Sequence, residues 1–157
     1  SCRAGRTLMV DEAARLAAER ACTALVHEWA RALDFGDQDH FLELFEADGR
    51  LVYGAAHEGL DALARFVGAR PRDRVTRHLI TNVFVDVLAP DRARGICYLT
   101  LFAGLRETPR AVPPAPAPAA VGHFEDRFQQ RDGCWRFASR TLHVALGALP
   151  EPSAGSG

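Results

Sequence analysis

Apolar side chains recur every three or four residues through the first part of the chain. Between Val10 and Leu33 they form one stripe, the spacing of an amphipathic helix that faces a core. Gly36 is expected to end this helix, because glycine readily adopts the left-handed conformation found after helix ends. The stripe consists of Ala18, Cys22, Leu25, Trp29 and Leu33.

Two shorter helices are expected next, with a short strand at Arg50–Tyr53 between them. Asp37 can cap the first of these helices, which we expect to end at Asp48-Gly49, and Pro71 stops the second. Their apolar faces are Phe41, Leu44 and Phe45 in the first and Leu60, Leu63, Ala64 and Val67 in the second.

The second half of the chain changes to β-branched and aromatic runs, which predict strands. Pro90 lies in the first connection between them, and Asp132-Gly133 in the second supplies the positive φ angles of a tight hairpin turn. The expected strands are residues 76–88, 92–105, 121–130 and 134–146.

A proline- and alanine-rich segment, residues 108–120, lies between the expected strands 92–105 and 121–130. It is expected to be an extended, mobile loop. We expect one domain over residues 10–146, with flexible termini at 1–9 and 147–157. Helices followed by antiparallel strands predict an α+β fold, in which a curved sheet wraps the long helix and two short helices complete a cone with a pocket at its open end.

The strand at 76–88 is apolar on both of its faces. Strict alternation puts Leu79, Val83, Val85 and Val87 on one face and Ile80 and Phe84 on the other. A sheet with one solvated face would alternate with polar residues, so the second face is expected to pack on another copy of the chain. A homodimer formed through the sheet is therefore expected.

Composition narrows the possible chemistry. The net charge is −1 and all 19 basic residues are arginine, which gives no reason to expect nucleic acid or a membrane as a partner and excludes lysine Schiff bases. The four cysteines have no metal or redox spacing, and no apolar run is long enough to cross a membrane. We expect a cytoplasmic protein. Since no G-x-S-x-G or G-x-G-x-x-G motif is present, acid–base catalysis by histidine and carboxylates remains.

Asp34, His78 and Tyr53 are the candidates for such chemistry. Asp34 ends the long helix and His78 begins a strand, so a carboxylate could fix the histidine tautomer and make the other ring nitrogen a better base. Tyr53 could donate its phenol proton to a substrate oxygen. The alternative is structural: a helix-ending aspartate, a satisfied histidine and an amphipathic residue at the edge of the core.

Other polar and aromatic residues could contact a substrate. Trp29 is more readily explained as core, and Asn82 could bind a ligand or the backbone, because regular alternation puts it on the face of His78. Arg140 faces Asp126 across the hairpin, which suggests an ion pair, with substrate contact as the alternative. His123, Glu125 and Asp126 resemble a metal site, but alternation turns Asp126 to the opposite face, so no metal is expected.

Several of these segments together resemble the SnoaL-like branch of the nuclear transport factor two-like superfamily, over roughly residues 10–146. They are Trp29-x-x-x-x-Asp34-x-Gly-Asp37, Phe45-x-x-Asp48, Arg77-His78-x-x-x-Asn82, Gly122-x-Phe-x-Asp126-Arg127 and Asp132-Gly133-x-Trp135-Arg136-Phe137. The resemblance implies the cystatin-like cone with a deep apolar pocket, commonly dimeric through the sheet.

Within that superfamily the chain is similar to scytalone dehydratases at Trp29, Asp34, Tyr53 and His78, and bile-acid dehydratases share the Asp/His pair. The resemblance implies cofactor-free loss of water from a hydroxylated cyclic, polyketide or steroid-like ketone. His78 would act as base and then acid, Asp34 would orient it, and Tyr53 would polarise the carbonyl. Leu33 replaces a tyrosine of scytalone dehydratases, and His123 is only an approximate counterpart of their second histidine.

Two other functions fit the same resemblance. The β subunits of ring-hydroxylating dioxygenases share this fold and serve structurally, so the chain could be a non-catalytic scaffold or ligand-binding subunit. A polyketide cyclase or ketosteroid-isomerase-like enzyme would instead use Asp34 itself as the base.

Overall fold

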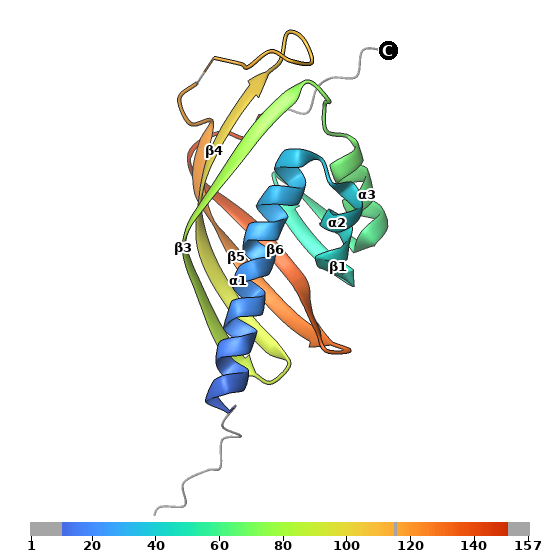
Figure 1. Ribbon diagram of the computed structural model, residues 1–157, viewed down its shortest axis with the longest axis vertical. Coiled ribbons are helices and arrows are strands. Elements are labelled where there is room, and N and C mark those ends of the chain that lie inside the picture. The colour runs from blue at the N-terminus through green and yellow to red at the C-terminus, as the bar shows by residue number, and fades with distance from the viewer. Residues whose placement is uncertain (1–10, 115, 151–157) are drawn as a thin grey trace, which may run out of the picture.

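A long helix lies across one face of a curved sheet (Figure 1). The computed structural model describes residues 11–114 and 116–150. The helices are α1 (Glu12–Phe35), α2 (Gln38–Glu43) and α3 (Gly59–Gly68). The strands are β1 (Phe45–Tyr53), β2 (Ala55–Glu58), β3 (Arg74–Ala89), β4 (Arg92–Leu105), β5 (Ala120–Arg131) and β6 (Cys134–Gly147).

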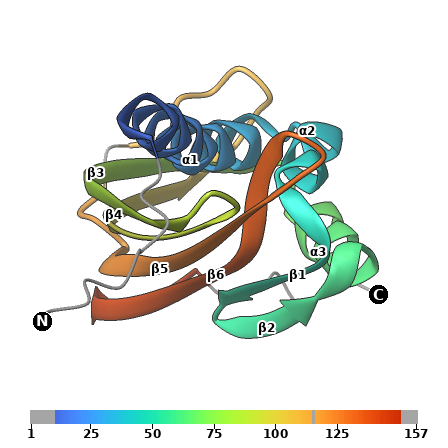
Figure 2. The same cartoon turned by 90° about the horizontal axis from the view of Figure 1, so that it is seen from below.

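Within the described residues the strands form one six-stranded sheet in the order β2-β1-β6-β5-β4-β3. Neighbouring strands are antiparallel except β1 and β6, which run parallel. Figure 2 shows α1 on the concave side of β3, β4 and β5, and α2 and α3 beside β1. The expected α+β fold, a sheet wrapped around the first helix with two short helices, is confirmed.

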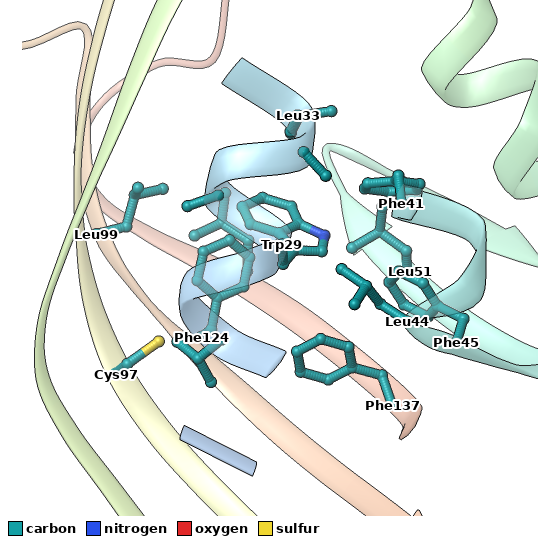
Figure 3. Packing of buried hydrophobic residues seen from close by; sticks show 14 of the residues in the cluster. Trp29, Leu33, Phe41, Leu44, Phe45, Leu51, Cys97, Leu99, Phe124 and Phe137 are labelled. Atoms are coloured by element: carbon teal, nitrogen blue, oxygen red, sulfur yellow. The ribbon is translucent and has the colours of Figure 1, made fainter. Parts of the chain in front are cut away.

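Trp29 lies at the centre of the core between α1 and the sheet (Figure 3). Its side chain is fully buried, and its ring makes an edge contact with Phe124 on β5 and a tilted contact with Phe41 on α2. Phe45 and Phe137 continue the packing toward the other end of the sheet. These rings fill the interior beneath α1, so a ligand pocket can form only beyond them.

The structure confirms the expected ends of several elements. Gly36 follows α1 with φ 74°, and the Asp37 side chain accepts a hydrogen bond from the His40 N–H at 3.2 Å. Asp132 and Gly133 both have positive φ, 51° and 76°, as a tight hairpin turn requires. Asp48-Gly49, however, does not end a helix: α2 stops at Glu43, and these residues lie inside β1 beside a bulge.

A β-bulge at Asn82 changes the face of the residues that follow it in β3, relative to the residues before it. The register shifts between Thr81 and Phe84, and Asn82 has φ 52°, a left-handed conformation that asparagine tolerates better than most residues. The extra residue changes which alternate positions face inward. Ile80 and Val83 therefore both pack against the core, whereas Leu79 and Phe84 are exposed on the outer face.

The outer face of the sheet remains rich in exposed apolar side chains. These include Leu79, Phe84, Leu88, Ile96, Tyr98 and Leu146, all more than a third exposed. Among the described residues, no helix combines the length and the hydropathy needed to cross a membrane.

Candidate active site

The carboxylate of Asp34 ties the end of α1 to the start of β3. Asp34 Oδ1 accepts a hydrogen bond from the Thr76 hydroxyl at 2.8 Å and lies 2.5 Å from His78 Nδ1. The other oxygen, Oδ2, accepts the backbone N–H of His78 at 2.9 Å. The side chains of Asp34 and His78 are only 7% and 0% exposed, so water competes little for these bonds.

The backbone explains why these groups meet. β3 is an edge strand, so some of its N–H groups have no neighbouring strand to accept them. The Asp34 carboxylate accepts the backbone N–H of His78 in place of a neighbouring strand. Thr76 and His78 are two residues apart on the strand, and both side chains therefore point to the same, inner face.

Tyr53, at the end of β1, completes a row of three polar groups. Its hydroxyl lies 3.0 Å from His78 Nε2. Because Asp34 occupies Nδ1, the consistent arrangement has Nδ1–H donating to Asp34 and the Tyr53 O–H donating to the free lone pair of Nε2. The Trp29 ring packs against both His78 and Tyr53, with centroid separations of 5.3 and 6.0 Å, and holds the two rings in place.

The environment sets the charges of these groups. Burial raises the pKa of Asp34, but the hydrogen bonds and charge of His78 and the bond from Thr76 outweigh it and hold that pKa below its usual value. Burial lowers the pKa of His78 in spite of Asp34. Burial raises the pKa of Tyr53. At neutral pH the row is therefore a carboxylate, a neutral imidazole and a neutral phenol.

A pocket of about 730 Å³ opens at the end of the cone formed by β1, β2, α3 and the start of β3. Its size is within the usual range for small-molecule sites. Tyr53 and Thr76 line the pocket, whereas Asp34 and His78 lie directly behind them. A ligand in the pocket would thus contact Tyr53 and Thr76 before it could reach Asp34 or His78. Phe66, Leu101 and Leu149 supply much of the apolar wall.

Arg140 is fully buried and does not line the pocket, in contrast to the substrate contact considered above. Its guanidinium donates to Asp126 at 2.9 Å and lies 3.8 Å from the centroid of the Phe124 ring and 4.6 Å from that of Trp29. Burial raises the pKa of Asp126 to about 6, against the opposing effect of Arg140. The expected structural ion pair is present.

The other expected substrate contacts also lie away from the pocket. Trp29 is a core residue, and the bulge leaves Asn82 exposed on β3 rather than beside His78. His123 lies on the outer face, where it pairs with His143 across β5 and β6. Within the described part of the chain, His123, Glu125 and His143 form the group that could hold a metal ion, with ligand atoms within 4.8 Å of one another. That group lies on the outer face of the sheet, whereas Asp34, His78 and Tyr53 lie on its inner side.

Sequence reasoning missed three residues of this region. Thr76 could have been found, because it precedes His78 by two positions on the same strand face. Arg70, which donates to the Thr76 hydroxyl at 2.8 Å, follows α3 in a segment without a regular pattern. Leu149 was assigned to the C-terminal tail, yet it packs against the core and lines the pocket.

Comparison with known proteins gives one match to a family model and several to solved structures. Residues 14–141 match the sequence model of the SnoaL-like domain. Among curated protein sequences, none is significantly similar to this chain. The solved structures that resemble it include an NTF2-like protein with a cystatin-like fold from Novosphingobium aromaticivorans, at 23% identity and a TM-score of 0.69, over 89% of this chain and 94% of that one.

Two further similar structures carry names that specify a reaction. One is a candidate scytalone dehydratase from Novosphingobium aromaticivorans DSM 12444, with 18% identity and a TM-score of 0.73, over 94% of this chain and 99% of that one. The other is the hexachlorocyclohexane dehydrochlorinase LinA-type3 from Novosphingobium barchaimii LL02, with 18% identity and a TM-score of 0.73, over 92% and 96%. At identities this low, the similarity of these structures establishes the shared cystatin-like, NTF2-like fold alone.

Proposed function

Because this chain belongs to the SnoaL-like domain family and brings Tyr53, His78 and Asp34 into one hydrogen-bonded row at the end of a pocket, we propose that it is a dehydratase. Its substrate would be a β-hydroxy ketone built on a cyclic, polyketide or steroid-like skeleton. The observation that carries the proposal is the 2.5 Å approach of His78 Nδ1 to a buried carboxylate, with Nε2 directed toward the pocket-lining tyrosine.

In the proposed reaction His78 is the base. As the substrate carbonyl takes the hydrogen bond of the Tyr53 hydroxyl, Nε2 is released and removes the proton next to the carbonyl. The Tyr53 O–H stabilises the enolate, and Asp34 stabilises the imidazolium that forms. The imidazolium then returns its proton to the departing β-hydroxyl, which leaves as water while the carbon–carbon double bond forms. No cofactor takes part.

The names of similar structures support this choice of reaction. Two of these structures are named as a candidate scytalone dehydratase and a hexachlorocyclohexane dehydrochlorinase, and both names denote an elimination. A base beside a hydrogen-bond donor at the end of an apolar pocket suits such eliminations.

The proposal is tested with 3-hydroxy-1-tetralone, a cyclic β-hydroxy ketone. Loss of water aromatises it to 1-naphthol, whose fluorescence reports the rate. We expect turnover above the buffer rate that requires His78. If this ketone and other cyclic β-hydroxy ketones react no faster than in buffer, while the protein forms a stable complex with a larger oxygenase chain, the scaffold function replaces the proposed one.

Tyr53→Phe is expected to lower kcat/KM about 10²-fold, the order of loss seen when one donor to a developing oxyanion is removed. The ring and its packing on Trp29 remain, so the melting temperature should change little. Steady-state kinetics on 3-hydroxy-1-tetralone provide the measurement. A loss as large as that of His78→Ala would contradict the carbonyl role and make Tyr53 the proton carrier between substrate and histidine.

The pH dependence of kcat/KM should show an acidic limb that lies below pH 6.5. The base must be neutral, and burial lowers the pKa of His78 from its model-compound value of 6.5. Activity is therefore expected to be at its plateau at pH 7 and to fall only as His78 becomes protonated under more acidic conditions. A limb centred above pH 6.5 would contradict this prediction, because it would mean that Asp34 raises the pKa of His78 above 6.5 by stabilising the charged ring.

We also propose that the chain forms a homodimer through the outer face of β3–β6. The support is the row of exposed apolar side chains there, among them Phe84, which is 63% exposed, and Tyr98, which is 52% exposed. Light scattering coupled to size-exclusion chromatography should give twice the chain mass. Phe84→Asp should give the monomer mass, and a monomeric wild-type protein would refute the proposal.

A further inference from the structure

Among the described residues that line the pocket, every side chain charged at neutral pH is an arginine. Arg65 on α3, Arg70 after α3 and Arg74 at the start of β3 line it, and no aspartate or glutamate is among the lining residues that the structure describes. The rest of the wall is mainly alanine, proline and large apolar side chains. A hydroxylated ketone alone gives no reason for three cations around an apolar cavity.

Within the described residues, the bonding of Arg65 and Arg70 leaves much of their donor capacity unused. Arg70 has five N–H donors, and its one side-chain partner within the described chain is the Thr76 hydroxyl at 2.8 Å. Neither Arg65 nor Arg70 forms an ion pair with a carboxylate of the described residues, although exposed arginines elsewhere, such as Arg31 and Arg94, do. Asp34 offsets part of the charge, but its oxygens already accept bonds from Thr76 and His78.

The positive charge lies next to the catalytic row. Arg70 reaches the row directly through Thr76, which in turn donates to Asp34. Arg70 and Arg74 both act electrostatically on the Tyr53 hydroxyl. The apolar wall begins at the same place, since the Phe66 ring packs on Tyr53 with centroids 5.8 Å apart. A ligand at Tyr53 would therefore have cations on one side and aromatic surface on the other.

We propose that Arg65 and Arg70, with Arg74, form a subsite for an oxyanion group of the substrate, so that the natural ligand joins an apolar ring system to a carboxylate or phosphate. This deepens the proposed function and rests on the same pocket being the substrate site. An arginine fork fits the paired oxygens of either anion, and the partly desolvated pocket strengthens the attraction. The same cations favour the enolate formed beside Tyr53.

The test compares three ligands of equal ring size: 2-naphthoate, 2-naphthyl phosphate and the neutral 2-naphthamide. Isothermal titration at low salt should show the preferred anion binding roughly tenfold or more tightly than the amide. The naphthoate and phosphate arms tell which oxyanion the subsite favours. Raising the salt to about 0.5 M should narrow the difference, because salt screens exposed charges.

Variants locate the effect. Arg65→Gln should weaken anion binding by roughly three- to tenfold and leave 2-naphthamide unchanged, because it removes charge without touching the hydrogen-bonded row. Arg70→Gln should do the same more strongly. Arg92→Gln, at the distant β3–β4 turn, is the matched control and should change the affinity for neither the anion nor the amide. Equal binding of anion and amide, or an anion preference that survives both Arg65→Gln and Arg70→Gln, would overturn the subsite.

The two proposals fail separately. His78→Ala should lower kcat/KM for dehydration about 10³-fold and keep the preference for the anion. Tighter binding of the anion than of the amide, without any turnover of a β-hydroxy ketone, would refute the dehydratase proposal and leave the subsite proposal standing. Turnover of 3-hydroxy-1-tetralone without any anion preference would refute the subsite and leave the dehydratase.

Discussion

His78→Ala is expected to lower kcat/KM for dehydration by about 10³-fold, within the range that a positioned general base contributes. The histidine would be the one group that both removes the proton and returns it to the leaving hydroxyl, so no neighbour can replace it. Tyr53 remains a neutral phenol, and both oxygens of Asp34 already accept hydrogen bonds. Steady-state kinetics on 3-hydroxy-1-tetralone measure the loss.

Folding must be separated from catalysis in this experiment, because His78 is buried and its removal leaves Asp34 without a partner. His78→Asn supplies that control: its amide N–H can replace Nδ1–H toward Asp34, yet it is no base. We expect the same loss of rate at a nearly unchanged melting temperature. His143→Asn, on the outer face, should leave the rate unchanged. His78→Asn within tenfold of wild type would show that another group is the base.

Asp34→Asn should lower kcat/KM by about 10²- to 10⁴-fold, because an amide in that place can impose the wrong histidine tautomer and cannot stabilise the imidazolium. It should also lower stability by about 2 kcal/mol, since charge-assisted hydrogen bonds from Thr76 and His78 are lost. Kinetics and urea unfolding measure the two effects. Asp86→Asn, an exposed ion-pair partner of Arg94, is the matched control.

This pair of variants also separates the dehydratase from an isomerase that uses Asp34 as its base. In an isomerase, Asp34→Asn would be severe while His78→Asn would cost little. In the structure both Asp34 oxygens already accept hydrogen bonds, which lowers the pKa of this carboxyl and makes it a weak base. Comparable losses in the two variants are therefore expected.

The sequence was sufficient to predict the long helix and the four long strands, whereas it left the Asp34–His78 contact open beside a structural alternative until the resemblance to dehydratases favoured it. The helix and the strands depend on local rules: a helical stripe ending at Gly36, two-residue alternation along β3, and a turn at Asp132-Gly133. The contact itself is non-local, since Asp34 ends α1 and His78 lies on β3, and local patterns do not show that the two side chains meet.

What the sequence did not predict depends on non-local geometry. The bulge at Asn82 shifts the alternation by one residue, and nothing in the local pattern marks where that shift falls. Strand β2 is only four residues long, Ala55–Glu58, and forms by pairing with β1. The position of Arg70 beside Thr76 results from the packing of α3 against β1 and from the turn into β3, which a linear pattern does not encode.

The most direct test of the central claim is the protonation state of the two His78 ring nitrogens, measured by ¹⁵N NMR at pH 7 and assigned with His78→Asn. The account predicts a neutral ring with the proton on Nδ1, held by Asp34, and a bare Nε2 that accepts from Tyr53. A proton on Nε2, or a doubly protonated ring, would contradict it, because the ring would then have no free lone pair directed toward Tyr53 and the pocket.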